Sequence, residues 1–244
     1  MKITNAQSNT SVAEIGDGIY RISTPVPPNP GLPAGFTFNQ FLIVDDEPVL
    51  FHTGPRKMFP LVSEAITAVM PISDLRYVGL SHFEADECGA LNELLSVAPR
   101  AVPLCSTIAK MVSVDDVADR EARDMADGET LTIGARTLVW LDAPHVPHGW
   151  DCGYLFEQTT RTLLCGDLFT QPGAEHPAVT EGDILGPSEG MRAQMDYFAH
   201  GSGTADILYK LAAKEPSTLA CMHGASYRGN GAELLGQLAT ALGS

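Results

Sequence analysis

Apolar and polar positions alternate with period two along the early chain, as they do in strands of a half-buried sheet. Residues 18–24 follow this pattern, and residues 38–54 form two apolar runs around the turn sequence DDEP. Two such runs joined by a short polar turn predict a β-hairpin. Residues 56–70 then change to helical spacing, with apolar side chains three or four positions apart. The early chain is therefore predicted to form strands followed by a helix.

The rest of the chain mixes short apolar runs with helical patterns. Strands are expected at 75–80 and 100–105, each followed by a helix, at 89–98 and 107–112. Four β-like segments separated by glycine, proline and polar turns come next, at 129–134, 136–143, 151–158 and 161–169. The chain closes with a helix, a strand and a helix, at 204–215, 218–224 and 231–243.

Two β-rich halves that each end in helices predict an α/β fold in which helices cover paired sheets from outside. An αββα sandwich satisfies this pattern as a single domain over residues 1–244. Two separate domains would need a linker, and the sequence shows no segment with the composition of one.

Composition narrows the classes of function. Hydrophobic residues make up 44% of the 244 residues, enough for a large core, and the formal charge of −15 argues against binding nucleic acid or an anionic membrane. The polar N-terminus lacks the apolar region of a signal peptide, and no stretch reaches the roughly 18 to 20 apolar residues of a membrane helix. The five cysteines are odd in number and form no C-x-x-C pair. A reduced, cytoplasmic protein is expected.

The segment SHFEADECGA, residues 81–90, carries the first candidate chemistry. It places His82, Glu84 and Asp86 at every second position, on one side of what looks like an extended loop between a strand and a helix. Such a triplet is typical of a solvated loop, of a salt-bridge cluster or of half a metal site. Loops at the carboxyl ends of strands are where α/β folds assemble their sites.

Further polar side chains follow apolar strands in the same way: His148, Asp167 and His223. Taken singly, a His or Asp at a strand end is more often a cap or turn residue, and His176 and His200 are read as such. If the strands are neighbours, however, the whole set converges on one edge. Imidazole and carboxylate groups bind divalent metals, and one aspartate between two histidine groups can bridge two ions.

The order of these motifs resembles that of the metallo-β-lactamase-fold superfamily, and most closely that of its flavodiiron-type branch. The order is H-x-E-x-D, then His, Asp and His. The resemblance covers nearly the entire chain and rests on six segments: FNQFLIVDDEPVLFHTG, SHFEADECGAL, HGWDC, LLCGDLF, CMHG and DYFAH. It implies that His82, Glu84 and His148 bind one iron, that Asp86 and His223 bind the other, and that Asp167 bridges them.

The metal expected in this branch follows from Glu84. Hydrolytic members of the superfamily carry H-x-H-x-D-H, a nitrogen-rich set suited to zinc, whereas Glu84 stands where their second histidine would be. Three carboxylates with three imidazoles make a harder site that favours iron or manganese, although zinc also binds such sites well.

Four departures from the family pattern matter. Glu87 replaces a ligand-type histidine and could bind metal, carry a hydrogen bond or face solvent. His52 replaces the usual aspartate of L-I-D-T-G. Both His145 and His148 precede Asp151, and His148 is preferred because it fits H-x-P-D, which leaves His145 in a supporting role. Finally, no flavodoxin-like domain that would bind FMN is expected in this chain.

These observations predict a non-haem diiron protein that either binds dioxygen or nitric oxide as a sensor or binds and reduces the gas as a reductase. A separate flavoprotein would donate the electrons, and a homodimer is expected. Tyr197, in the segment that resembles Y-Y-A, is the candidate catalytic residue, since its hydroxyl could donate a hydrogen bond to the bound gas. The stretch before it, residues 182–190, looks like a loop able to fold over the site.

Two alternatives stay open. A dinuclear metallohydrolase would use a metal-bound hydroxide on an ester, thioester or lactone. A binding module would keep its metals for structure only. The carboxylate at position 84 favours the diiron protein over the hydrolase.

Overall fold

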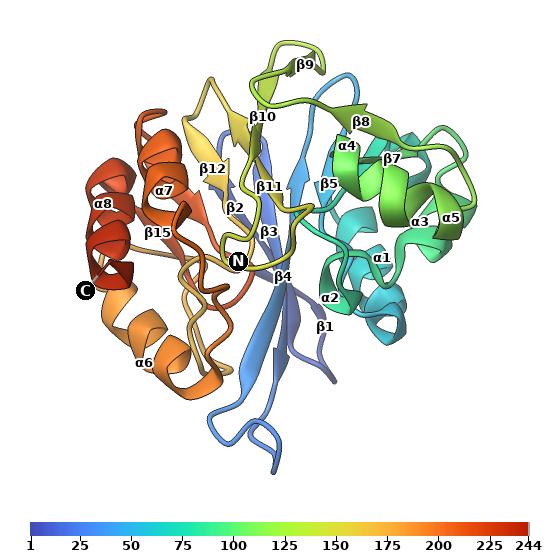
Figure 1. The fold of residues 1–244 in the computed structure, drawn as a ribbon. Helices are drawn as coiled ribbons and strands as arrows, with labels where there is room; N and C mark the ends of the chain where they lie inside the picture. The colour runs from blue at the N-terminus through green and yellow to red at the C-terminus, as the bar shows by residue number, and fades with distance from the viewer. Residues whose placement is uncertain (244) are drawn as a thin grey trace.

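A computed structural model describes residues 1–243 and shows two sheets packed face to face between two layers of helices (Figure 1). The first sheet, within that range, contains β1 (Lys2–Asn5), β2 (Thr10–Gly16), β3 (Ile19–Val26), β4 (Phe36–Ile43), β5 (Val49–Phe51), β6 (Tyr77–Gly79), β7 (Val102–Ser106) and β8 (Arg123–Met125), in this spatial order. The predicted hairpin is β4 and β5, which pair antiparallel with Phe41 opposite Phe51.

The second sheet has the spatial order β13-β15-β14-β12-β11-β10-β9. Its strands are β9 (Thr130–Thr132), β10 (Thr137–Asp142), β11 (Gly153–Glu157), β12 (Thr162–Leu164), β13 (Val179–Thr180), β14 (Thr218–Ala220) and β15 (Ser226–Arg228). Strands β12 and β14 are parallel neighbours, with Leu164 opposite Ala220. The segments that follow these two strands therefore leave the sheet at the same edge.

Helices cover the outer face of each sheet (Figure 1). Those beside the first sheet are α1 (Phe59–Thr67), α2 (Ala85–Cys88), α3 (Leu91–Val97), α4 (Thr107–Ala109) and α5 (Asp115–Val117), with short helical turns at Arg56–Met58, Ile72–Asp74 and Lys110–Val114. Those beside the second are α6 (Leu185–Met195), α7 (Thr204–Ala212) and α8 (Gly231–Leu242).

Strand periodicity explains how the chain fills three apolar layers. Successive side chains of a strand point to opposite faces, so a strand buried on both faces feeds two cores. In β4, Leu42 packs with Ile66 and Leu94 under the first helical layer, whereas its neighbour Phe41 packs with Trp140 between the sheets. A third cluster joins the second sheet to α7 and α8. The predicted αββα sandwich of the metallo-β-lactamase fold is confirmed.

One local prediction is wrong. Residues 182–190 are not a loop throughout, because α6 begins at Leu185. The carboxylate of Asp183 accepts hydrogen bonds from the backbone amides of Leu185 and Gly186, and Pro187 lies in the first turn, where a helix needs no amide donor. A proline that looked like a helix breaker thus sits at a position that tolerates it.

No helix within residues 1–243 is both long enough and apolar enough to cross a membrane.

Candidate metal centre

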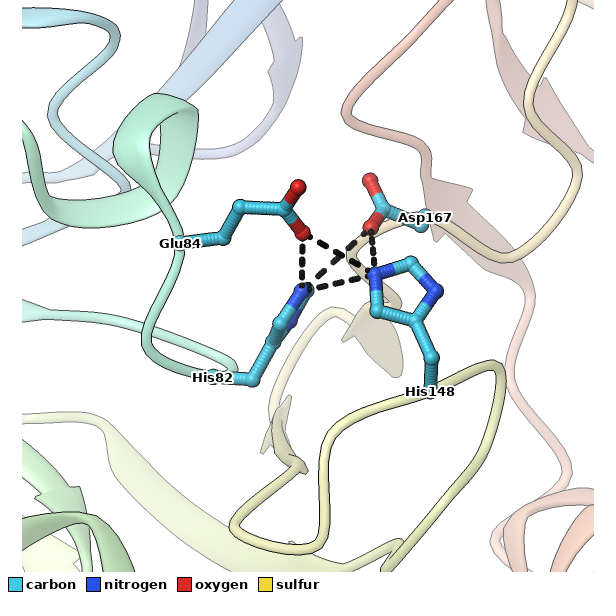
Figure 2. Close-up of side chains that lie close together, drawn as sticks. All are labelled: His82, Glu84, His148 and Asp167. Carbon is cyan, nitrogen blue, oxygen red and sulfur yellow. Dashed lines mark hydrogen bonds and ion pairs between the residues drawn. The ribbon is translucent and has the colours of Figure 1, made fainter. Parts of the chain in front are cut away.

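Four side chains meet where the loops after β6, β10 and β12 converge (Figure 2). Nε2 of His82 and Nε2 of His148 each lie 3.0 Å from Oε2 of Glu84, and 3.0 Å from one another. Oδ2 of Asp167 lies 3.7 Å from His82 and 3.5 Å from His148. All four donor atoms fall within 4.8 Å of one another, which is the spacing of groups that share one ion.

A second group of donors lies on the other side of Asp167. Nε2 of His223 is 3.1 Å from Oδ1 of Asp167 and 3.4 Å from Oδ2 of Asp86. The two oxygens of Asp167 therefore face different groups, Oδ2 toward the first and Oδ1 toward the second. A carboxylate placed in this way has the geometry of a bridge between two cations.

The backbone explains why Glu84 and Asp86 face different groups. The spacing H-x-E-x-D suggested one extended segment, but the backbone bends over residues 81–83, Glu84 alone is extended, and the helical turn α2 begins at Ala85. Asp86 therefore leaves the side that Glu84 occupies and reaches His223. The amide of Phe83 donates a hydrogen bond of 2.9 Å to Oδ2 of Asp151, which fixes the loop between the two ligands.

Each of the three imidazoles is held by its other ring nitrogen. Nδ1 of His148 donates to the carbonyl of Tyr197 at 2.8 Å, and Nδ1 of His223 donates to the carbonyl of Thr37 at 2.7 Å. Each bond places a proton on Nδ1 and turns Nε2 toward the other donor atoms, where it can bind a metal once it carries no proton. Nδ1 of His82 lies 3.0 Å from the hydroxyl of Ser81.

His52, which replaces the family's usual aspartate, reaches the centre through Ser81. Its Nε2 lies 2.9 Å from the Ser81 hydroxyl, so His52, Ser81 and His82 form a hydrogen-bonded chain. Burial lowers the pKa of His52 to about 3, which keeps the ring neutral. The residue therefore positions His82 without adding charge.

The carboxylates of the centre are held in the ionised form. Hydrogen bonds from His148 and His82 lower the pKa of Glu84 far below its usual range. Burial raises the pKa of Asp167, but contact with His223 outweighs it and lowers the value to about 2. Burial likewise opposes charge on His223, and its contacts with Asp167 and Asp86 raise its pKa to about 10.

The surroundings of Glu87 indicate whether this set of donor residues suits metal ions. Its side chain is fully buried, and neither carboxylate oxygen has a hydrogen-bond partner. Burial and the charges of Asp167 and Asp86 raise its pKa well above the usual value. One of its oxygens also lies within 4.8 Å of an oxygen of Glu84 and of an oxygen of Asp86. Buried carboxylates without donors are costly, and a divalent cation offsets that cost, so the residues present fit two metal ions.

The other candidates lie apart from these groups. His145 is exposed, His176 is half-buried with Nε2 3.2 Å from the carbonyl of Pro172, and His200 is exposed beside Asp196. Tyr197 contributes its backbone carbonyl to His148, and its ring lies 6.3 Å from that imidazole. Its buried hydroxyl lies near Ser188 and Thr170 but makes no hydrogen bond of good geometry, and burial raises its pKa to about 12.

Sequence reasoning missed the residues that orient the ligands. Ser81 and Thr37 hold the imidazoles of His82 and His223, and Asp151 holds the loop at Phe83. Ser81 and Asp151 stand inside the quoted motifs, so their positions were visible in the sequence. No sequence pattern marked Thr37, because its backbone carbonyl holds His223 and any residue type supplies such a carbonyl.

Taken together, the αββα sandwich and the paired donor groups at one edge define a metallo-β-lactamase-fold protein with a candidate dinuclear centre. The family model described as ODP family beta lactamase matches residues 36–224, a range that contains all six predicted ligands. The chain belongs to this family.

Similar proteins are flavodiiron proteins and related oxidoreductases. The chain is 25% identical over 170 residues to the rubredoxin-oxygen oxidoreductase of Megalodesulfovibrio gigas. The matched region covers 69% of this chain and 42% of that protein. It is 29% identical over 142 residues to the nitric oxide reductase of Moorella thermoacetica, and this match covers 56% of this chain and 35% of that protein. The flavodiiron core from Synechocystis sp. superposes with a TM-score of 0.83 at 21% identity, covering 96% of this chain and 60% of that one.

The chain spans less than half the length of the two curated relatives. The structural match, at 21% identity, supports the fold.

Proposed function

We propose that this protein holds two iron ions and uses them to bind dioxygen or nitric oxide, and to reduce the gas when an external donor supplies electrons. The observation that carries the proposal is Asp167, whose two oxygens face two separate groups of ligand-type side chains. Relatives named as a nitric oxide reductase and as a rubredoxin-oxygen oxidoreductase support the same chemistry.

In this proposal His82, Glu84 and His148 hold one iron, Asp86 and His223 hold the other, and Asp167 binds both. The buried carboxylate of Glu87 is close enough to the second group to complete it. When bound, a pair of irons supplies the redox change that the reaction needs. The protein's own contribution is to fix the ligand positions through Ser81, Tyr197 and Thr37.

The donor set favours iron over zinc. The six predicted ligands comprise three carboxylates, Glu84, Asp86 and Asp167, and three imidazoles. With Glu87 included, carboxylates outnumber imidazoles by four to three. Hard oxygen donors in this number suit iron or manganese, whereas nitrogen-rich sets suit zinc.

Protein purified after iron supplementation tests the proposal. We expect about two irons per chain by elemental analysis, near-ultraviolet absorption typical of a ferric pair, and a changed spectrum when the reduced protein meets nitric oxide. Consumption of the gas with a flavoprotein donor would assign a reductase, and binding without consumption would assign a sensor. A colourless zinc protein that hydrolyses an ester, thioester or lactone would contradict the proposal and support the hydrolase.

Tyr197 is proposed to donate a hydrogen bond to the bound gas. Its hydroxyl is buried and protonated, and its ring packs near His148. Tyr197→Phe should keep the fold and the metal content but weaken gas binding by roughly 1 to 3 kcal/mol, the value of a hydrogen bond to a charged acceptor. Gas titrations of the fully metallated variant measure this, and unchanged binding would remove Tyr197 from the site.

The proposal has three further parts: a homodimer, a cytoplasmic location, which rests on the five unpaired cysteines, and a separate flavoprotein as electron donor. Light scattering tests the first, cell fractionation the second, and electron transfer from candidate flavoproteins the third.

A further inference from the structure

A cavity near the candidate metal centre is lined by Thr37, which holds His223, and by none of the six predicted ligands. Its volume is about 830 Å³. Its walls come from β2, β3 and β4, from the prolines after β3 and from the segment 174–177. Small-molecule sites in proteins occupy about 300 to 1,000 Å³, so the cavity has the size of a site for an organic ligand.

Arg21 lies at the inner end of this cavity. It stands on β3 opposite Phe41 and shares its face of the strand with Ile19, and both Phe41 and Ile19 belong to the apolar core between the sheets. Only 2% of the residue is exposed. Its Nη2 donates one hydrogen bond of 2.8 Å, to the carbonyl of Gly224, and its Nε is buried without a partner. Within residues 1–243, no carboxylate forms an ion pair with it.

Two other arginines, the buried Arg136 and the half-buried Arg120, show how this chain pairs a guanidinium. Arg136 lies 3.0 Å from Asp17 and 3.7 Å from Glu157. Arg120 donates three hydrogen bonds to backbone carbonyls, those of Ala98, Ala101 and Leu95. Arg21 has neither arrangement, although burying an unpaired charge is in general strongly unfavourable. An anion in the cavity would supply the missing partner.

The cavity wall around Arg21 is suited to an anionic group. Ser11, Ser23 and Thr37 are hydroxyl-bearing residues of this wall, and His176 also lines the cavity. Among the cavity's lining residues, the one carboxylate is that of Glu175, which is exposed. Most of the remaining wall is apolar, from Ile3, Val26, Met58 and the prolines at 25, 27, 28 and 177.

We propose that this cavity binds an organic carboxylate with an apolar body. The carboxylate pairs with the guanidinium of Arg21 and accepts hydrogen bonds from the nearby hydroxyls, because the planar fork of arginine matches the two oxygens of a carboxylate. The apolar body lies against the prolines and Met58. The site does not depend on which metal the neighbouring centre holds.

A ligand in this position would touch the groups that hold His223. Arg21 and Asn39 both donate to the carbonyl of Gly224, which directly follows His223. The hydroxyl of Thr37 accepts from the amide of Gly224 at 2.7 Å, while the carbonyl of Thr37 accepts from Nδ1 of His223. Occupancy of the cavity therefore bears on a metal ligand through backbone contacts.

Calorimetric titrations of the protein with four probes test the proposal: octanoate, octan-1-ol, acetate and inorganic phosphate. We expect octanoate to bind most tightly, since it alone offers both the carboxylate and the apolar body. Amide signals of Arg21, Thr37 and Gly224 should shift in nuclear magnetic resonance spectra as octanoate is added. If octanol binds as tightly as octanoate, the carboxylate charge has no role and the proposal is overturned. If acetate or phosphate binds as tightly as octanoate, the apolar body has no role and the proposal is likewise overturned.

Variants locate the site. Arg21→Gln should weaken octanoate binding roughly tenfold or more, as expected for a lost hydrogen bond to a charged group. Arg228→Gln is the matched control, because Arg228 also donates from Nη2 to a backbone carbonyl, that of Ile15, but lies outside the cavity. Equal losses in both variants, or none in Arg21→Gln, would overturn the proposal.

A third variant serves if Arg21→Gln fails to fold. Ala174 lines the cavity from a loop and is half-buried, so Ala174→Phe fills space without changing charge. It should abolish octanoate binding while the circular dichroism spectrum stays that of the parent. Unchanged octanoate affinity in folded Ala174→Phe would place the binding elsewhere and refute the site.

Discussion

At the scale of single residues, Asp167 has the most consequential position. It is buried, it follows β12 directly, and its two oxygens face the two groups of ligand-type side chains. Each of the other five predicted ligands belongs to one group, so its loss should affect one ion, whereas the loss of Asp167 should affect both.

This difference gives a prediction about metal content. Asp167→Ala should lower occupancy at both positions, because a bridging carboxylate serves two ions, and His223→Ala should mainly empty one. Elemental analysis of both variants after identical iron loading measures the effect. If Asp167→Ala still carries two metals per chain, the bridging role is wrong.

His52 is a second residue whose position has a measurable consequence. The pKa of its buried ring is lowered from 6.5 to about 3 by burial, so the unfolded chain takes up a proton between those values and the folded protein does not. Its contribution to stability is therefore complete above pH 6.5 and declines as the pH falls toward 3.

We expect the stability advantage of the parent over His52→Asn to shrink as the pH falls below 6.5, by up to about 1.4 kcal/mol per pH unit. Asparagine is suitable because His52 has φ of 67°, a left-handed conformation that asparagine tolerates. Urea unfolding of both metal-free proteins between pH 7 and pH 4.5 measures the difference. A constant difference across this range would show that His52 does not stay neutral in the folded protein.

At the scale of elements, β10 and β11 approach closely at the end of the loop that carries His148. A Cβ atom on Gly153, the first residue of β11, would lie 2.4 Å from the ring of Trp140. Trp140 is fully buried, and its Nε1 donates to Asp142 at 2.7 Å, so it cannot move away cheaply. The strand pair therefore requires glycine at this position.

Gly153→Ala should destabilise the protein by roughly 1 to 3 kcal/mol, as overpacking a rigid core does. Gly190→Ala is the control, since no atom lies within 4 Å of its added Cβ and it stands inside α6. That variant should gain roughly 0.5 to 1 kcal/mol, the usual preference for alanine over glycine in a helix. Denaturant unfolding of both variants checks the pair, and a neutral Gly153→Ala would mean that Trp140 has room to shift.

At the scale of the whole molecule, the metal centre lies between loops that come from both sheets. His82, Glu84 and Asp86 follow β6 of the first sheet, whereas His148, Asp167 and His223 follow strands of the second. Bound ions would therefore join the two halves of the sandwich and neutralise the buried carboxylates of Asp167 and Glu87.

Removal of metal should accordingly lower the melting temperature of the entire protein, since ions that bind only the folded state stabilise it. We expect chelation to lower the Tm of iron-loaded parent protein clearly, and that of Asp167→Ala much less. Differential scanning calorimetry with and without chelator measures both. Equal decreases in the two proteins would show that the stabilising ions bind elsewhere.

Much of the fold could be predicted because its signals are local. Period-two alternation located β3, apolar runs between turn sequences located β4, β5 and β10, and three-to-four spacing located α1, because these patterns lie within short stretches of chain. The short strands β13 and β15 have too few residues to show a period. The start of α6 was missed because Pro187 reads as a breaker except in a first helical turn.

The sequence by itself determined the αββα architecture and the order of candidate ligands, since strand periods and H-x-E-x-D spacing lie within short stretches of chain. Only the tertiary structure placed Asp167 between two donor groups, because those groups come from different sheets. It also brought His148 into the cluster while leaving His145 exposed, through a bond to the Tyr197 carbonyl. Arg21 looked like one polar residue in an alternating strand, and its missing partner became visible only when the second sheet covered it. Contacts between distant segments depend on packing, which local patterns do not encode.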